Sequence, residues 1–225
     1  MKRTIIAILI IAVLASVPVL ASSKAENSLG LIAGFGYQYN TYKDDNNKIT
    51  ISTLQMPLAI TDTVFFDKKS AIGLFAEIGL NMNLSATIKT NDSKSDPQDL
   101  GYDDGTYPTF FDITLGAAYR TKSKDLNLLL GAGVEIATKT SQYSLGTIAD
   151  AKRTQTFVGL GLTGGIAMNL GDNVDLVLGA KASLWFIDHN KIVYTLLGQT
   201  TTDTNTDDGY FAFSILPRAT LTYTF

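Results

Sequence analysis

The sequence predicts an all-β protein, an eight-stranded antiparallel up-and-down transmembrane β-barrel. Three observations lead to this fold class. Apolar and polar residues alternate in eight separate segments, which is the period of a strand with two different faces. The connections between the segments are alternately short and long. Aromatic residues gather near both ends of the segments, while aliphatic residues fill the levels between them.

The composition agrees with this fold class and excludes several others. Of the 225 residues, 45% are hydrophobic and 17% are charged, against roughly 25% charged in an ordinary soluble domain. The chain has no cysteine, which excludes a disulfide scaffold, a zinc ribbon, an iron–sulfur protein and a thiol enzyme. Its net charge of −3 argues against a nucleic-acid partner, because phosphate binding needs a basic surface.

Residues 1–21 are predicted to be a signal peptide that is cleaved after Ala21. A positive start at residues 1–3 is followed by an apolar run over residues 5–14 and by small residues before the cleavage point. The alternative is an N-terminal transmembrane helix. The apolar run is short for a span of about 20 residues, and Pro18 follows it. We therefore expect residues 22–225 to be exported and to form the barrel.

The first four strands are predicted over residues 29–39, 54–60, 72–84 and 111–120. In the first, Leu, Ala, Phe and Tyr alternate with a glycine-rich face. The second is the least regular, and we expect a bulge near Thr53. In the third, seven apolar residues oppose a face that carries Glu77, and in the fourth the opposing face carries Asp112.

The last four strands are predicted over residues 126–136, 155–169, 174–184 and 211–225. Six apolar residues of the first of these oppose a face with Glu135. The next sets Val, Leu, Ile and Met against Gly and Thr. The other two oppose apolar faces to polar faces that carry Lys181 and Arg218, respectively. No segment after residue 21 approaches 18 consecutive apolar residues, so no helix is expected to cross a membrane there.

The distribution of charge favours a membrane barrel over a soluble sandwich or a lipocalin-like barrel. The polar faces are mostly Gly, Thr, Ser and Asn, and the apolar faces of seven strands carry no charge, with Asp62 near a strand end as the one doubtful position. A lipid-facing charge costs roughly 2–4 kcal/mol at mid-bilayer. The aromatic residues form one set near the short turns and a second toward the long connections. Two such girdles are typical of two membrane interfaces.

The long connections are predicted to be acidic surface loops. They lie near residues 42–48, 89–106, 140–153 and 188–209, and hold 12 of the 21 acidic residues against seven bases. The short turns at residues 67–70, 121–125 and 171–173 have ordinary turn chemistry. We therefore expect four exposed loops at one end of the barrel.

The whole chain after residue 21 resembles the small bacterial outer-membrane β-barrel proteins of the OmpA/OmpX and OmpW types. The resemblance is one of pattern, and its sharpest element is the C-terminus, Leu221-Thr222-Tyr223-Thr224-Phe225. It implies assembly from the periplasm into the outer membrane of a diderm bacterium, where outer-membrane lipid surrounds the barrel. We expect the barrel to be a monomer. The resemblance also implies that Leu221, Tyr223 and Phe225 form the signal that the barrel-assembly machinery recognises.

Five charged residues are predicted to form one inward layer at mid-height: Glu77, Asp112, Glu135, Lys181 and Arg218. Eight strands enclose room only for side chains or one small ligand, so a wide pore is not expected. The favoured interpretation is a salt-bridge plug, because unpaired buried charge is costly. A polar gate or an ion-conducting constriction is the alternative, and a pair of catalytic carboxylates is a third reading.

Three aromatic residues, Phe110, Phe157 and Trp185, are predicted to face inward nearer the long connections. Pro57 and Pro217 fall near mid-height on the two strands that flank the first strand, where proline removes a ladder hydrogen bond. The OmpW-type resemblance implies an apolar upper lumen from which small hydrophobic molecules leave sideways. The favoured interpretation is ordinary packing of large side chains against glycine, with the prolines at bulges.

The sequence predicts no catalysis, no cofactor and no metal site. His189 is the only histidine, and no motif places a nucleophile beside it. Phosphate-loop and dinucleotide fingerprints are missing. We expect a structural or interaction role at the cell surface, with a host surface ligand as a candidate partner. The alternative is a narrow channel or binding pocket for small hydrophobic solutes.

Overall fold

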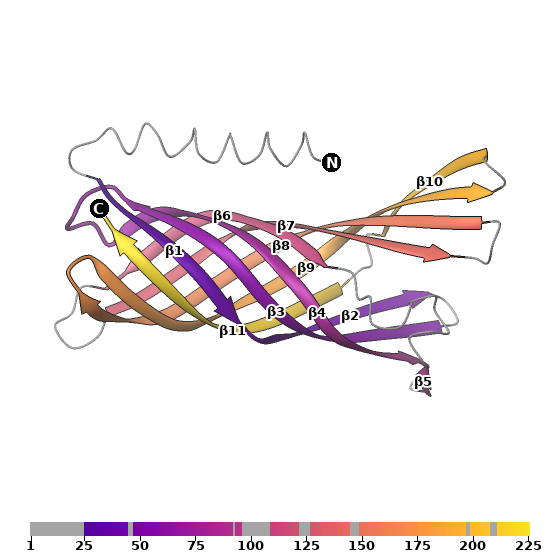
Figure 1. The fold of residues 1–225 in the computed structure, drawn as a ribbon, viewed down its shortest axis with the longest axis horizontal. Helices are drawn as coiled ribbons and strands as arrows, with labels where there is room; N and C mark the ends of the chain where they lie inside the picture. The colour runs from indigo at the N-terminus through magenta and orange to yellow at the C-terminus, as the bar shows by residue number, and fades with distance from the viewer. Residues whose placement is uncertain are drawn as a thin grey trace.

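The computed structural model describes residues 25–44, 47–91, 93–95, 109–121, 127–144, 149–196, 199–207 and 211–225. In Figure 1 these residues form a tilted barrel whose short turns lie at the left and whose long hairpins project to the right. The segment predicted to be a signal peptide lies outside the described residues. Within the described ranges, no helix is long and apolar enough to cross a membrane.

Every regular element of the described chain is a β-strand, and all pairings are antiparallel. The strands are β1 (Glu26–Gly34), β2 (Gly36–Asp44), β3 (Asn47–Phe65), β4 (Ile72–Thr90), β5 (Ser93–Ser95), β6 (Phe110–Arg120), β7 (Asn127–Ser144), β8 (Ala149–Gly171), β9 (Val174–Leu196), β10 (Gln199–Asp207) and β11 (Phe211–Thr224).

Eight wall strands close into a ring. β1 and β2 are separated only by Phe35 and act as one wall strand, followed by β3, β4, β6, β7, β8 and β9. β11 completes the ring because it pairs with β1 and β2 on one side and with β9 on the other. β5 and β10 pair with the outer parts of β4 and β9. The predicted eight-stranded up-and-down barrel is confirmed.

The two faces of the wall differ as the alternation predicts. On β1 the side chain of Leu31 is 61% exposed, whereas that of its neighbour Ile32 is 4% exposed. Most of the large exposed side chains on the wall strands are Leu, Ile or Val, and exposed aromatic side chains flank them toward each end. A surface of this composition is stable against lipid, which is the solvent of a barrel of this kind.

Two bulges change which residues face the lumen. β3 and β4 pair Leu54 with Ser85 and Gln55 with Asn83, so that Leu84 is the extra residue. The irregularity expected near Thr53 is therefore present, with its extra residue on the neighbouring strand. β8 and β9 pair Val158 with Ile187 and Gly159 with Trp185, which makes Phe186 the second extra residue. A bulge opposes two residues to one and shifts the alternation beyond it.

The prediction of a long loop was wrong for most of the length of three connections, near residues 42–48, 140–153 and 188–209. Most of the fourth, near residues 89–106, lies outside the described residues. β2 and β3 remain paired as far as Asp44 with Asn47, and β7 and β8 as far as Ser144 with Asp150. β9 and β10 pair residues 188–196 with residues 199–207. Figure 1 shows these extensions as two sheets that project from the barrel, β2–β5 and β7–β10. These parts of the strands are mostly polar on both faces, so their sequence lacks the apolar alternation that identifies a strand.

The wall is interrupted at Phe35. Between Ala33, which pairs with Leu58, and Gly36, which pairs with Gln55, no pairs to β3 are formed. The pairs with β11 stop at Gly34 and resume at Tyr37 in the same register, and between them the Phe35 backbone N–H donates to the Pro217 carbonyl oxygen at 3.1 Å. The residues that are skipped on the two neighbouring strands include Pro57 and Pro217, which have no backbone N–H to donate.

Candidate functional site: the filled lumen

The structure brings the five charged residues of the middle lumen together. The ammonium nitrogen Nζ of Lys181 lies 2.7 Å from Asp112 Oδ1, 3.1 Å from Glu77 Oε1 and 3.2 Å from Glu135 Oε1. Arg218 Nη1 lies 2.8 Å from the Glu77 carboxylate. These residues come from β4, β6, β7, β9 and β11, so that the charge layer ties five strands across the lumen.

Polar side chains complete the charge layer. Lys181 Nζ also donates to Thr114 Oγ1, Arg218 donates to Thr163 Oγ1, and Asn81 Nδ2 donates to Asp112 Oδ2. An ammonium group has three N–H donors, and here they are shared among three carboxylates and one hydroxyl. Three carboxylates against two cations give the layer a formal charge of −1.

Glycine on the polar faces makes room for the charge layer. A Cβ atom at Gly161 would lie 2.9 Å from Thr114 Cγ2 and 3.0 Å from Glu135 Oε2. A larger residue at this position would therefore displace a member of the layer. The polar faces are therefore rich in glycine, because glycine leaves space for the charged and hydroxyl-bearing side chains of the neighbouring strands.

An aromatic cluster closes the lumen next to the charge layer, on the side of the projecting hairpins. Phe110, Phe157 and Trp185 pack with Ala137 and Ala212, and all five are buried. The ring centres of Phe110 and Phe157 are 5.4 Å apart, and each lies 6.4 Å from Trp185. The three rings predicted to face the upper lumen thus contact one another.

A further polar layer, which the sequence reasoning missed, lies beyond the aromatic cluster. Asp188 is fully buried and accepts hydrogen bonds from Gln155 and Asn190 at 2.9 Å. Arg153 Nε donates to Asn190 Oδ1, and Lys139 Nζ lies 5.5 Å from the centre of the Phe110 ring. The bulge at Phe186 is what turns Asp188 inward, and no feature of the alternation in this strand predicts it.

Asp188 and His189 do not form a catalytic pair. His189 is exposed and its Nδ1 lies 2.9 Å from Thr206 Oγ1 of β10. Asp188 is buried on the opposite face of β9, because successive residues of a strand point in opposite directions. The histidine predicted to lie in a loop is therefore part of the paired β9–β10 hairpin.

Amide side chains line another part of the lumen, beside the bulge of β4. Gln55 Nε2 donates to Gln38 Oε1 at 2.6 Å and to Asn83 Oδ1 at 2.8 Å, and Gln38 Nε2 donates to Asn40 Oδ1 at 3.2 Å. Gln38 and Gln55 are almost completely buried. A buried amide that was not hydrogen-bonded would be costly, so this chain of bonds helps to fix the register of β2, β3 and β4.

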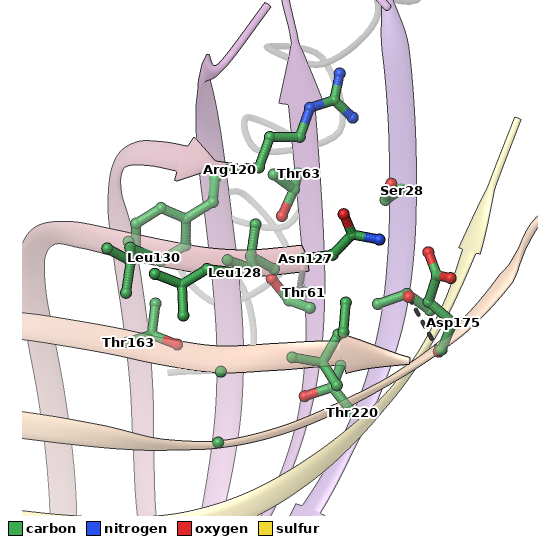
Figure 2. Close-up of a pocket in the computed structure, with 18 of the residues that line it drawn as sticks. Ser28, Thr61, Thr63, Arg120, Asn127, Leu128, Leu130, Thr163, Asp175 and Thr220 are labelled. Carbon is green, nitrogen blue, oxygen red and sulfur yellow. Dashed lines mark hydrogen bonds between the residues drawn. The ribbon is translucent and has the colours of Figure 1, made fainter. Parts of the chain in front are cut away.

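The lumen end near the short turns is organised by Arg120. Its guanidinium lies 3.7 Å from the centre of the Phe65 ring, forms an ion pair with Glu26, and donates to the carbonyl oxygen of Ser70. Between Arg120 and the charge layer lies a cavity of about 440 Å³ (Figure 2). Its lining includes Glu77 and Arg218 of the charge layer.

The three C-terminal residues of the predicted assembly signal lie on the lipid-facing side. Leu221, Tyr223 and Phe225 are all exposed, and they end the strand that closes the barrel. The rings of Tyr223 and Phe225 are 5.8 Å apart. An apolar stripe at the end of the closing strand is thus available to a partner from outside the barrel.

Comparison with known proteins gives one family. The family model described as "Outer membrane protein beta-barrel domain" matches residues 7–214. A search of curated protein sequences gives no match. Among solved structures, a major outer membrane protein from Thermus thermophilus is 19% identical with a TM-score of 0.56, and the match covers 89% of this chain and 99% of that chain. That score shows the same fold.

Two further structures are similar at lower scores. Neisserial surface protein A (NspA) is 15% identical with a TM-score of 0.48, over 89% of this chain and 99% of that chain. OprG from Pseudomonas aeruginosa is 17% identical with a TM-score of 0.46, over 90% and 97%. Because the family model covers most of the sequence, the chain belongs to the outer membrane protein beta-barrel domain family and is a β-barrel protein of the bacterial outer membrane.

Proposed function

We propose that this protein is a monomeric, non-conducting and non-catalytic barrel with a structural or interaction role at the cell surface. The observation that supports the proposal is the filling of the lumen. The Glu135 side chain of the charge layer and the Phe157 side chain of the aromatic cluster are each only 1% exposed. Two successive layers of buried side chains at mid-height support a lumen that does not conduct.

The projecting sheets are the part of the molecule that would meet a partner. β8 and β9 have 23 residues each, whereas about 9–11 residues of a tilted strand cross a bilayer. Roughly half of each strand therefore extends beyond the lipid. The partner that we propose is a surface ligand outside the cell, such as a host surface component.

Planar bilayer recordings test the filled lumen. We expect the wild-type protein to give no discrete conductance, and a variant with Phe157→Ala and Trp185→Ala to give openings, because it removes two of the three rings. Leu160→Ala, at an exposed position on β8, is the matched control. If the wild type conducts reproducibly and Gly161→Met abolishes the conductance, the protein is a channel and the proposal fails.

The interrupted wall supports a second candidate function, the passage of small hydrophobic solutes into the membrane. The interruption at Phe35 borders an apolar groove on the lipid side, which Ala33, Leu58, Leu80 and Phe111 line. Opening of the wall on the β3 side would break few hydrogen bonds, because Gly34 and Phe35 form no pairs with β3. On the other side, the Phe35 backbone N–H still donates to the Pro217 carbonyl oxygen at 3.1 Å.

A single reversible crosslink tests this second candidate. Ala33 and Leu58 are direct register partners, and the chain has no other cysteine, so Ala33→Cys with Leu58→Cys can form one specific disulfide across the seam. A pathway through the seam predicts that uptake of a hydrophobic fluorophore by cells falls on oxidation and recovers on reduction. Equal uptake with and without the protein would eliminate this candidate.

A further inference from the structure

Hydroxyl groups and apolar side chains lie side by side in the lining of the cavity between Arg120 and the charge layer. The hydroxyl groups form one patch, the hydroxyl wall, on three adjacent strands, β1, β3 and β11. Ser28 lies opposite Thr63 and Thr224, and Gly30 lies opposite Thr61 and Thr222. With Thr220, these residues place six hydroxyl-bearing positions in one continuous surface, part of which Figure 2 shows.

Gly30 orients the hydroxyl wall. A Cβ atom at Gly30 would lie 2.8 Å from the Cγ2 methyls of Thr61 and Thr220 and 3.0 Å from that of Thr222. The methyl groups therefore pack over the glycine, and the hydroxyl groups turn away from it. The Ser28 and Thr224 hydroxyls bond to each other, and the Thr61 and Thr222 hydroxyls donate to the carbonyl oxygens of Ala76 and Asp175. Within the described residues, the hydroxyls of Thr63 and Thr220 have no such bond, so these two can bond to a ligand.

Apolar side chains lie next to these hydroxyl groups. Phe65 and Phe75 pack with Leu129, and all three line the cavity together with Val177. Phe75 is the register partner of Thr63, and Val177 is that of Thr220. A sugar ring has the matching chemistry, because its C–H faces are apolar and its rim carries hydroxyl groups. The cavity volume falls within the range of about 300–1,000 Å³ that is typical of small-molecule sites, and suits one or two sugar rings.

The charges of the lining disfavour an anionic ligand. Glu77 and Arg218 are paired at the inner end of the cavity, and Glu26 and Arg120 are paired at the outer end. Asp175 lies at the outer end as well and accepts a hydrogen bond from Asn169. An anionic ligand would add a charge for which the described lining offers no unpaired cation, and such a charge is costly to bury.

We propose that this cavity binds a carbohydrate of one or two rings without a negative charge, which enters from the end of the barrel with the short turns. In barrels of this class the short turns face the periplasm, so the ligand would be a periplasmic sugar. This inference concerns the opposite end of the molecule from the projecting sheets, and does not depend on the role proposed for them.

Nuclear magnetic resonance of the barrel in detergent micelles, with labelled Thr and Leu methyl groups, tests the proposal. The probes are glucose, glucosamine and glucuronate, which share a ring but differ in charge. We expect saturable shifts of the Thr61, Thr220 and Leu129 methyls with glucose, and binding of glucuronate that is about tenfold weaker or undetectable. Equal responses to the three sugars, or shifts that stay linear with concentration, would overturn the proposal.

A variant that removes hydroxyls without changing volume gives a second arm. Thr63→Val with Thr220→Val should weaken glucose binding by about tenfold, because two hydrogen bonds are lost. Thr87→Val, at an exposed position on the projecting part of β4, is the matched control and should bind as the wild type does. Unchanged binding by the double variant would refute the site, and if it does not fold, the two single variants carry the same test.

Discussion

One ammonium group, that of Lys181, lies against three carboxylates in a part of the lumen that water barely reaches. Each carboxylate would be costly to bury without it, since the attraction of the pair is what offsets the desolvation of both partners. Lys181 is thus the only cation of the charge layer that is paired with Asp112 and Glu135, because Arg218 neutralises only the Glu77 carboxylate.

We therefore predict that Lys181→Met lowers the free energy of unfolding by about 3–5 kcal/mol, since it leaves buried carboxylates unpaired. The measurement is urea unfolding of the barrel in detergent or lipid, followed by tryptophan fluorescence from Trp185. Lys152→Met, at an exposed position on β8, is the control and should change the stability little. Equal midpoints for the two variants would show that the charge layer is not a stabilising plug.

The members of the charge layer could be located from the sequence because each lies in a regular part of its strand. Counting from the short turns gives the height of Glu77, Asp112 or Glu135, and the alternation gives its face. Asp188 could not be located in this way. It follows the extra residue Phe186, and beyond that point the alternation of β9 reverses.

At the scale of the element, the bulge in β9 allows residues before and after it to face the lumen although their spacing is odd. Trp185 and Asp188 are three residues apart, and yet both are buried. A regular strand would place them on opposite faces. The extra residue Phe186 allows the aromatic cluster and the outer polar layer to share one side of the same strand.

We predict that deletion of Phe186 is tolerated, with a loss of no more than about 2 kcal/mol in the free energy of unfolding. Without it, Trp185 and Ile187 would follow one another, and Asp188 would still face inward opposite Phe157. Deletion of Leu178, in a regular part of the same strand, would instead turn Lys181 or the residues before it to the lipid. The shift between unheated and boiled samples on a gel, which reports the folded barrel, should survive only the first deletion. A loss of the shift in both would contradict the assigned bulge.

The ends of the strands were the least predictable part of the elements. Toward the projecting ends, the sequence of β7–β10 is rich in Thr, Asn, Asp and Lys. Such a composition predicts loops, because no apolar alternation distinguishes one face from the other. The pairing partners of Thr206 or Lys191 are set by the hairpin register that begins inside the membrane, which the local composition does not contain.

At the scale of the whole molecule, the number of strands, the lipid-facing surface and the closed ring could be predicted, because all three follow from the contrast between lipid and lumen. The interruption at Phe35 could be anticipated only from Pro57 and Pro217, which sequence analysis placed at bulges. Closure itself depends on β11, the last strand of the chain, which pairs with three other strands. Nothing encloses the lumen until this final strand has been added.

We expect the Phe225 side chain to be needed for assembly of the barrel but to contribute little to the stability of the barrel once it has closed. Its backbone N–H donates to the Asn27 carbonyl oxygen at 3.0 Å, while its side chain is exposed to the lipid side. Phe225→Ala retains this backbone bond and removes only an outward ring. We therefore predict that purified Phe225→Ala refolds in detergent with the gel shift of the wild type, but that its amount in the outer membrane of living cells falls severalfold.

The control is Phe211→Ala, which removes an exposed, lipid-facing ring at the other end of β11. If both variants accumulate as the wild type does, the C-terminal aromatic is not the feature that the assembly machinery recognises. If Phe225→Ala fails to refold even when purified, its role is in the closed barrel and not in its assembly.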